Sequence, residues 1–383
     1  DGEVTPQGVQ LKPYEGTALG EGTKYCDVSS LKDSELSCLA MLQDPQKAAP
    51  QGVWGLDYAL RKQPDVHLRM TLVCPSDGKL VVAKGRPPAG RKLYDMTWAI
   101  LKSKGDDPLT KQYLNVIEPY EGNRVIRSIE RLPFESTEDP TQFAPLAIRI
   151  TTDSFVDTVL LQHTAGREIV AGGVRCDGEF GLWRERDGTF QTAALVRGTT
   201  LIKGEHGITL ASAEYTGEIA SCDWSSRTIL IRPKPEALPA PGRHLRITNA
   251  NGSSASYHVK DAEFVENACR IAFDIDPRIG EGFVKDCQDA VVRSATHLKL
   301  YRYDYYAGKT LTNETGSVLY RLQNVQKGQD CVISRAGQTE VNVARLHEQF
   351  ADLDGDGLRR FVIYDYGPGD SVSMENSAVM TGQ

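Results

Sequence analysis

Aspartates near the C-terminal end of the chain have a spacing that suits a cation. Asp352, Asp354 and Asp356 alternate and are followed by Gly357, which is the D-x-D-x-D-G start of a calcium loop. Oxygen ligands at alternate positions, with a glycine for the sharp turn, suit Ca²⁺. The usual closing glutamate is absent, so Asp365 or a later aspartate would complete the ligand shell. This spacing predicts Ca²⁺ as a cofactor; the alternative is a turn whose aspartates cap backbone N–H groups.

Tyrosines gather in a second segment. Tyr301, Tyr303 and Tyr305 alternate within residues 297–306, which we expect to form a strand, so their rings would lie on one face. Aromatic rings stack on sugar faces, and tyrosine hydroxyls reach polar partners. The segment therefore predicts a carbohydrate-binding stripe. The alternative is the half-buried face of a sheet.

The remaining reactive side chains do not form a known catalytic motif. The seven histidines are scattered singly, and the spacing of Tyr58 and His67 does not pair them. The sequence contains no serine-hydrolase elbow and no nucleotide-binding glycine pattern. The eight cysteines form no C-x-x-C pair, which argues against structural zinc. They are either buried thiols or disulfides, with Cys269 and Cys287 as the candidate pair.

The elements that must position these residues are almost all strands. Apolar and polar residues alternate over residues 66–73, which predicts a half-buried strand, and a turn at 75–78 predicts a hairpin with residues 80–83. Similar runs recur along the chain between turns rich in glycine and proline. Helical patterns are confined to residues 33–42 and 343–350. The sequence therefore predicts an all-β fold, an antiparallel β-sandwich.

A change in strand length and turn regularity near residue 200 predicts two domains. Residues 1–197 would form the larger two-sheet sandwich, and residues 198–383 a smaller C-terminal β domain. A chain of 383 residues is long enough for this division.

The composition of the chain argues against some classes of binding partner. The chain has 44 Lys and Arg against 51 Asp and Glu, a formal net charge of −7, and no basic run. This balance argues against nucleic acid as a partner. No apolar stretch approaches the roughly 20 residues that a membrane span requires.

The order of several motifs resembles a known family. The segment YLNVIEPYEGNRVIRSIERLPF, residues 113–134, is similar to consecutive strands in the C-terminal β region of heparinase II/III-like polysaccharide lyases. Further similar segments are residues 56–72, 81–88, 178–188, 198–220, 242–259 and 352–370. The resemblance implies a secreted bacterial protein, located outside the cell or in the periplasm.

The resemblance also implies a role. Family members carry out β-elimination on uronate-containing glycans, with catalytic residues on an upstream α/α toroid and on early His-rich strands. Neither region is recognisable here, so no catalytic residue is assigned, and the chain is expected to be a non-catalytic β portion that forms a cleft wall and supports the toroid. Its first residue, Asp1, suggests a piece of a longer protein. The expected partners are an acidic polysaccharide and either the toroid polypeptide or a neighbouring subunit that completes the sandwich. The alternative is a structural or carbohydrate-binding module that assembles by strand complementation into an extracellular or surface polymer.

Overall fold

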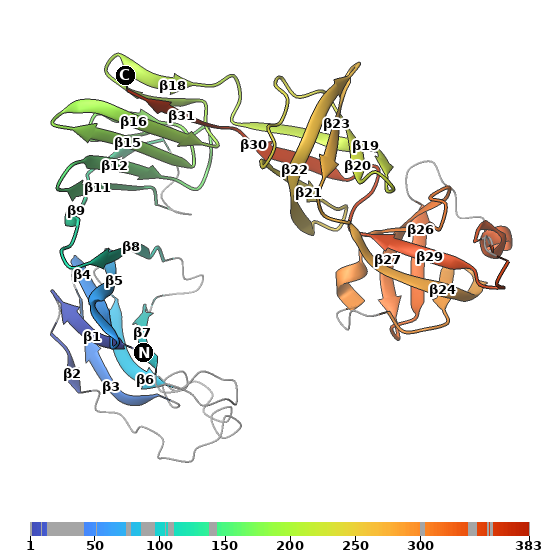
Figure 1. Cartoon of the computed structure of the whole chain (residues 1–383), viewed down its shortest axis with the longest axis horizontal. Helices are drawn as coiled ribbons and strands as arrows, with labels where there is room; N and C mark the ends of the chain where they lie inside the picture. The colour runs from blue at the N-terminus through green and yellow to red at the C-terminus, as the bar shows by residue number, and fades with distance from the viewer. Residues whose placement is uncertain are drawn as a thin grey trace. The chain divides into compact units, whose positions relative to one another are not determined.

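The chain is built from antiparallel β-sheets (Figure 1). The structure is a computed structural model that describes residues 2–8, 10–13, 42–50, 52–73, 78–85, 96–103, 105, 111–137, 144–298, 303–335, 343–350, 352 and 355–382. Over these residues the only helical elements are two short 3-10 helices. The predicted all-β, sandwich-type antiparallel fold is confirmed.

The chain divides into two compact units. Unit 1 contains Asp1–Ala213 together with Ser377–Gln383, and unit 2 contains Glu214–Asn376. The predicted boundary between residues 197 and 198 falls inside unit 1. Strands β17 (Thr200–Lys203) and β18 (His206–Thr209) follow that boundary, but β17 pairs with β14 (Val174–Cys176) and therefore extends a sheet of unit 1.

The first half of unit 1 is a sandwich of two four-stranded sheets. One sheet has the order β1 (Gly2–Gln7), β4 (Val53–Leu60), β5 (Gln63–Val73) and β8 (Leu114–Glu121). The other has the order β2 (Lys12–Pro13), β3 (Gln43–Ala48), β6 (Lys79–Gly85) and β7 (Met96–Lys102). Their shared core contains Trp54, Leu56, Leu72, Leu80 and Val82.

One predicted connection in this sandwich is wrong. Strands β5 and β6 were expected to form a hairpin, but β5 pairs with β4 and β8, whereas β6 pairs with β3 and β7. The chain crosses from one sheet to the other between them. The reason is burial: Leu72 and Leu80 lie on facing sheets and pack into one core instead of lying side by side in one sheet.

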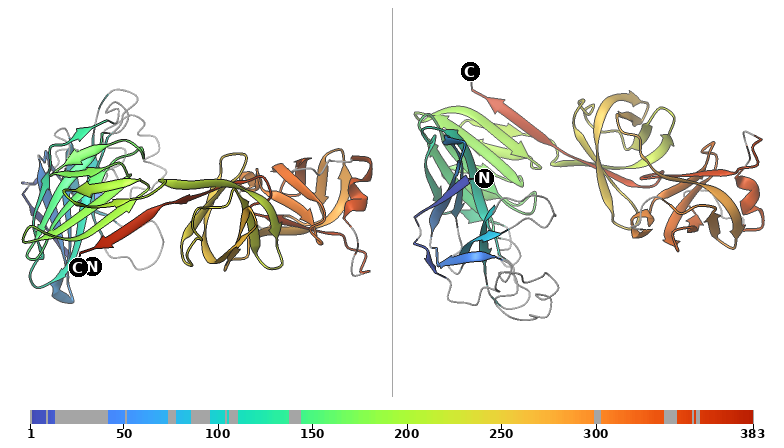
Figure 2. Two further views of the ribbon diagram at one scale, coloured as in Figure 1. Left: turned by 90° about the horizontal axis from the view of Figure 1, so that it is seen from above. Right: turned by 60° about the horizontal axis from the view of Figure 1, so that its bottom comes forward.

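The second half of unit 1 is another pair of sheets. A six-stranded sheet has the order β31 (Ser377–Thr381), β16 (Thr189–Val196), β15 (Phe180–Arg186), β12 (Val156–Leu161), β11 (Leu146–Thr152) and β9 (Ile126–Arg131). A five-stranded sheet joins β10 (Glu135–Ser136), β13 (Ile169–Ala171), β14, β17 and β18. Trp183, Leu160 and Leu201 are among the residues of their core. Figure 2 shows the last strand, β31, beside β16, with which it pairs.

Unit 2 contains two closed barrels. The first consists of β19 (Glu214–Asp223), β20 (Thr228–Arg232), β21 (His244–Thr248), β22 (Ser254–Val265), β23 (Ala268–Phe273) and β30 (Ser371–Glu375). The second consists of β24 (Arg278–Gln288), β25 (Val291–Ser294), β26 (Thr310–Asn313), β27 (Leu319–Gln326), β28 (Asp330–Arg335) and β29 (Arg360–Tyr364). Each barrel has its own apolar core.

Two smaller predictions about local structure have different outcomes. The short helix expected at residues 343–350 is present as the 3-10 helix η2 (Val343–Gln349). Residues 33–41, where the other helix was expected, lie outside the described part of the chain.

The predicted disulfide is absent from the structure. The pairing of Cys269 with Cys287 is wrong, because both are free thiols. Cys269 lies on β23 in the first barrel, whereas Cys287 lies on β24 in the second.

Candidate functional site

The tyrosine segment has a different shape from the predicted one. Tyr303 and Tyr305 lie in the 3-10 helix η1 (Tyr303–Tyr306), and Tyr301 lies outside the described residues. The predicted strand is therefore wrong over residues 303–306, and the two rings do not share a face, because each 3-10 residue turns by about 120°. Tyr303 packs against the core of the second barrel, whereas Tyr305 is 44% exposed. Sugar contact by these tyrosines stays a prediction.

The predicted calcium loop makes hydrogen bonds within itself. The Asp352 carboxylate accepts the Gly357 N–H at 2.7 Å, and Asp356 accepts the N–H two residues further on at 2.8 Å. Asp356 also accepts a hydrogen bond of 2.5 Å from Arg360. The backbone hydrogen bond and the Arg360 guanidinium hold the pKa of Asp356 below its ordinary value. These contacts are the backbone caps of an Asp-Gly turn.

Asp365, the residue expected to close the calcium shell, has other partners. Its side chain is buried, and Lys309 Nζ lies 2.7 Å from its Oδ1. The hydroxyl of Tyr257 donates to Oδ2, and that of Tyr305 donates to Oδ1 at 3.3 Å. Within the described residues, no group of three or more His, Cys, Asp and Glu side chains could hold a metal ion. Asp354 is not described. Calcium binding therefore stays a prediction.

Asp365 belongs to a buried ionic network that joins the two barrels of unit 2. Lys309 Nζ also donates to Asn249 Oδ1 at 2.6 Å, and Asn249 Nδ2 donates to Asp370 Oδ2 at 2.8 Å. Arg321 Nη1 lies 2.8 Å from the other Asp370 oxygen. Burial raises the pKa of Asp370, although Arg321 acts in the opposite direction. Each buried charge in this network has a partner of opposite sign, as burial requires.

A cleft with a volume of about 520 Å³ lies in unit 2, lined by loops of both barrels. Trp224, from the β19–β20 turn, stacks on Tyr364 at the end of β29, with ring centroids 3.9 Å apart and planes 6° apart. We call this the Trp224 cleft. It is lined by Cys222, Asp223, Trp224, Ser225, Arg227, Asp276, Arg278, Glu314, Thr315, Gly316, Leu319, Tyr364 and Pro368.

The polar side chains of the Trp224 cleft include both donors and acceptors. Asp223 accepts the Ser225 hydroxyl at 2.7 Å and the Ser226 N–H at 3.3 Å. Hydrogen bonds from these two serines lower the pKa of Asp223 to about 2, so it is ionised at neutral pH. Arg278 pairs with Asp276 at 3.1 Å. Carboxylates and guanidinium groups therefore stand beside a stacked aromatic pair, which suits a ligand rich in hydroxyl groups.

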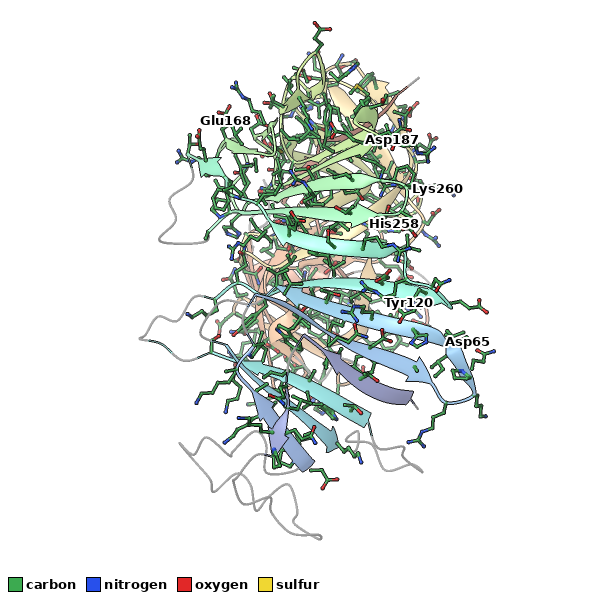
Figure 3. All side chains as sticks on the ribbon, turned by 90° about the vertical axis from the view of Figure 1, so that its left-hand side faces the viewer. Asp65, Tyr120, Glu168, Asp187, His258 and Lys260 are labelled. Carbon is green, nitrogen blue, oxygen red and sulfur yellow. The ribbon has the colours of Figure 1, made fainter. Side chains whose placement is uncertain are left out.

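A second polar cluster lies on the outer face of the β1-β4-β5-β8 sheet, where Figure 3 labels Tyr120. Asp57 Oδ1 lies 2.7 Å from His67 Nδ1, and the Tyr120 hydroxyl donates to Asp57 Oδ2 at 2.6 Å. The His67 and Tyr120 rings stack with centroids 4.7 Å apart. Arg69 covers the neighbouring Gly55, where an added Cβ would lie 2.8 Å from its guanidinium. We call these residues the Asp57 cluster.

Electrostatics set the protonation of Asp57 and Tyr120. Burial raises the pKa of Asp57, but hydrogen bonds from Tyr120 and His67 and the charge of Arg69 outweigh it, so the net shift is downward. Burial and the hydrogen bond to Asp57 raise the pKa of Tyr120 to about 12. Tyr120 is therefore a neutral donor at physiological pH. Asp57 holds the His67 ring in one orientation, the arrangement that positions an imidazole for proton transfer.

Sequence reasoning missed this cluster because it depends on strand register. Tyr58 does not join His67, because Tyr58 packs against the core on the other face of the sheet. Asp57 is opposite Arg69, and His67 is opposite Tyr120, across the β4–β5 and β5–β8 pairs. The two-residue alternation could have placed Asp57 and His67 on one face, but no local signal brings in Tyr120 from a distant strand.

Three comparisons with known proteins return no match: no protein-family model, no curated protein and no solved structure matches the chain. The resemblance to polysaccharide lyases therefore stays a prediction. No helix among the described residues is long and apolar enough to cross a membrane.

Proposed function

We propose that this chain binds a glycan in the Trp224 cleft, as a non-catalytic β portion of a heparinase II/III-like polysaccharide lyase. The observation that carries the proposal is the stacking of Trp224 on Tyr364 beside ionised Asp223. Sugars present apolar faces to aromatic rings and hydroxyl groups to carboxylates and guanidinium groups. A volume of about 520 Å³ falls within the range of small-ligand sites and would accommodate a short saccharide segment.

The proposal includes the substrate class and location that the sequence resemblance implies. The glycan would be an acidic, uronate-containing polysaccharide, and Arg227 and Arg278 at the cleft would meet its carboxylates. The catalytic toroid would be a separate region or polypeptide. An extracellular or periplasmic location is compatible with buried thiols, because burial raises the pKa of Cys176 to about 11 and that of Cys331 to about 12, which makes both unreactive.

A second candidate function, assembly by strand complementation, has one observation in its favour. Strand β8 is an edge strand of its sheet. Ile117 on β8 is 61% exposed and Leu68 on β5 is 46% exposed, although both lie on the face that carries the core residue Leu56. An exposed apolar edge can pair with a strand from the toroid polypeptide or from a neighbouring subunit.

Calorimetric titration with short uronate-containing and neutral oligosaccharides tests the first function. We expect the parent chain to bind an oligosaccharide and Trp224→Ala to weaken that binding by about two- to tenfold, because one aromatic contact contributes about 0.5–1.5 kcal/mol. Trp98→Ala is the matched control, since Trp98 is 40% exposed on β7 and does not line the cleft. Equal affinities for the two variants would contradict the cleft. Absence of glycan binding by the parent, with particles of high mass in light scattering, would favour assembly.

A further inference from the structure

Two histidines face each other on the outside of the first barrel of unit 2. His244 on β21 and His258 on β22 are directly opposite in the antiparallel register. Their ring centroids lie 4.2 Å apart and the ring planes are 82° apart. Both side chains are exposed. Figure 3 labels His258 together with Lys260, two positions further along the same strand.

The strand geometry brings these two side chains closer than most opposite pairs. The Val259 N–H donates to the Arg243 carbonyl at 2.8 Å, so the adjacent pair in the ladder is hydrogen-bonded. Hydrogen-bonded and non-hydrogen-bonded pairs alternate, which makes His244 and His258 a non-hydrogen-bonded pair. In such pairs the Cα atoms lie about 4.5 Å apart and the side chains meet.

We propose that His244 and His258 form a binding site for a divalent transition-metal ion of the Cu²⁺ or Zn²⁺ class. Neutral imidazole is a preferred ligand of these ions, at about 2.0–2.1 Å for zinc. Exposed rings already in contact can place one nitrogen each on a shared ion by rotating about their side-chain bonds. Because no three-residue metal group exists among the described residues, water fills the other coordination positions.

The surroundings of the pair support a fixed site. Leu245, Tyr257 and Val259, which flank the histidines along the strands, are buried in the barrel core and hold the backbone in place. The nearest outward-facing cations on the two strands have carboxylate partners: Arg246 lies 3.7 Å from Glu375, and Lys260 lies 3.9 Å from Asp274. These carboxylates offset the positive charge that would otherwise oppose a metal ion.

Binding of Cu²⁺ alone to the purified chain tests this site. We expect one Cu²⁺ per chain, with electron paramagnetic resonance showing two nitrogen ligands. His244→Gln and His258→Gln should each weaken Cu²⁺ binding by about tenfold or more. Replacing a residue that only hydrogen-bonds to a metal-binding histidine already lowers metal affinity by about tenfold, and a direct ligand should matter at least as much. Because both positions are exposed, the variants should keep the parent melting temperature in the absence of metal.

The matched control is His206→Gln. His206 is exposed on β18 in unit 1, where its ring stacks on Phe190 at 5.2 Å instead of facing a second histidine. This variant should bind Cu²⁺ as the parent does. A parent that binds no Cu²⁺, or binding that survives both His244→Gln and His258→Gln unchanged, would overturn the proposal. Glycan binding by the Trp224 cleft should be the same in all three variants, so the two proposals fail separately.

Discussion

Asp57 shows how a single residue organises one face of a sheet. It receives hydrogen bonds from His67 and Tyr120, which lie on two different strands, and Arg69 Nη1 lies 3.7 Å away. The carboxylate is buried, so the partners replace the water that it loses on folding. The cluster therefore ties β4, β5 and β8 together from the polar side of the sheet.

Replacing this carboxylate should destabilise the chain in a pH-dependent way. We expect Asp57→Asn to reduce the free energy of unfolding by about 1–3 kcal/mol at about pH 7, because it removes a charged acceptor from buried donors. The pKa of Asp57 in the folded chain lies below the ordinary value of an aspartate. Its contribution is therefore present above that value and disappears as the pH falls through the folded pKa. Urea unfolding at about pH 7 and about pH 3 should show a smaller difference from the parent at the lower pH.

The control for this experiment is Asp65→Asn on the neighbouring strand β5. Asp65 is exposed near the start of β5 (Figure 3), so its replacement should change stability by no more than about 0.5 kcal/mol. A deficit of Asp57→Asn that stays constant across the pH range would argue against an ionised, hydrogen-bonded Asp57.

At the scale of elements, the alternation of apolar and polar residues predicts where strands lie. It does not predict which strands pair with one another. The alternation over residues 66–73 correctly predicts strand β5. The hairpin at 80–83 failed because burial of Leu72 and Leu80 between two sheets depends on contacts that sequence periodicity does not encode. The tyrosine run also alternates, yet residues 303–306 fold as η1, where the buried Tyr306 packs into the core of the second barrel.

Lys309, which directly precedes β26, links segments of the two barrels in unit 2 through its buried ammonium group. We expect Lys309→Met to reduce the free energy of unfolding by about 3–5 kcal/mol, because Asp365 would remain buried without its cation. Lys309 is only 2% exposed, and its Nζ contacts Asp365 and Asn249, which come from segments after β29 and β21. Chemical unfolding measures the change.

Lys285→Met provides the comparison for this prediction. Lys285 is exposed on β24 of the same barrel, so its loss should cost no more than about 0.5 kcal/mol. If the two methionine variants are equally stable, the buried network contributes little to the junction of the barrels. The double variant Lys309→Met with Asp365→Asn should recover part of the loss, since it removes the unpaired charge.

At the scale of the whole chain, the units are nested in sequence. Unit 1 is interrupted after Ala213 and resumes at Ser377, so that β31 pairs with β16 after the chain has formed unit 2. The second barrel is in turn contained between β23 and β30 of the first barrel. A predicted division at residue 197 could not reveal this order, because the pairing of the last strand with β16 is visible only in three dimensions.

Because unit 2 is one continuous segment inserted into unit 1, we expect it to fold without the rest of the chain. Its first and last strands, β19 and β30, pair with each other from Glu214 opposite Glu375, so excision at these ends leaves the first barrel closed. We expect residues 214–376 alone to unfold cooperatively in urea. Trp224 is the only tryptophan in this segment, and its fluorescence reports the transition directly. Residues 214–370 lack β30, so the first barrel has two open edges and should lose the cooperative transition that Trp224 reports, although the second barrel keeps all its strands. If both segments show the same cooperative transition, the first barrel does not need β30 for its stability. If neither segment shows one, unit 2 depends on unit 1 for its fold.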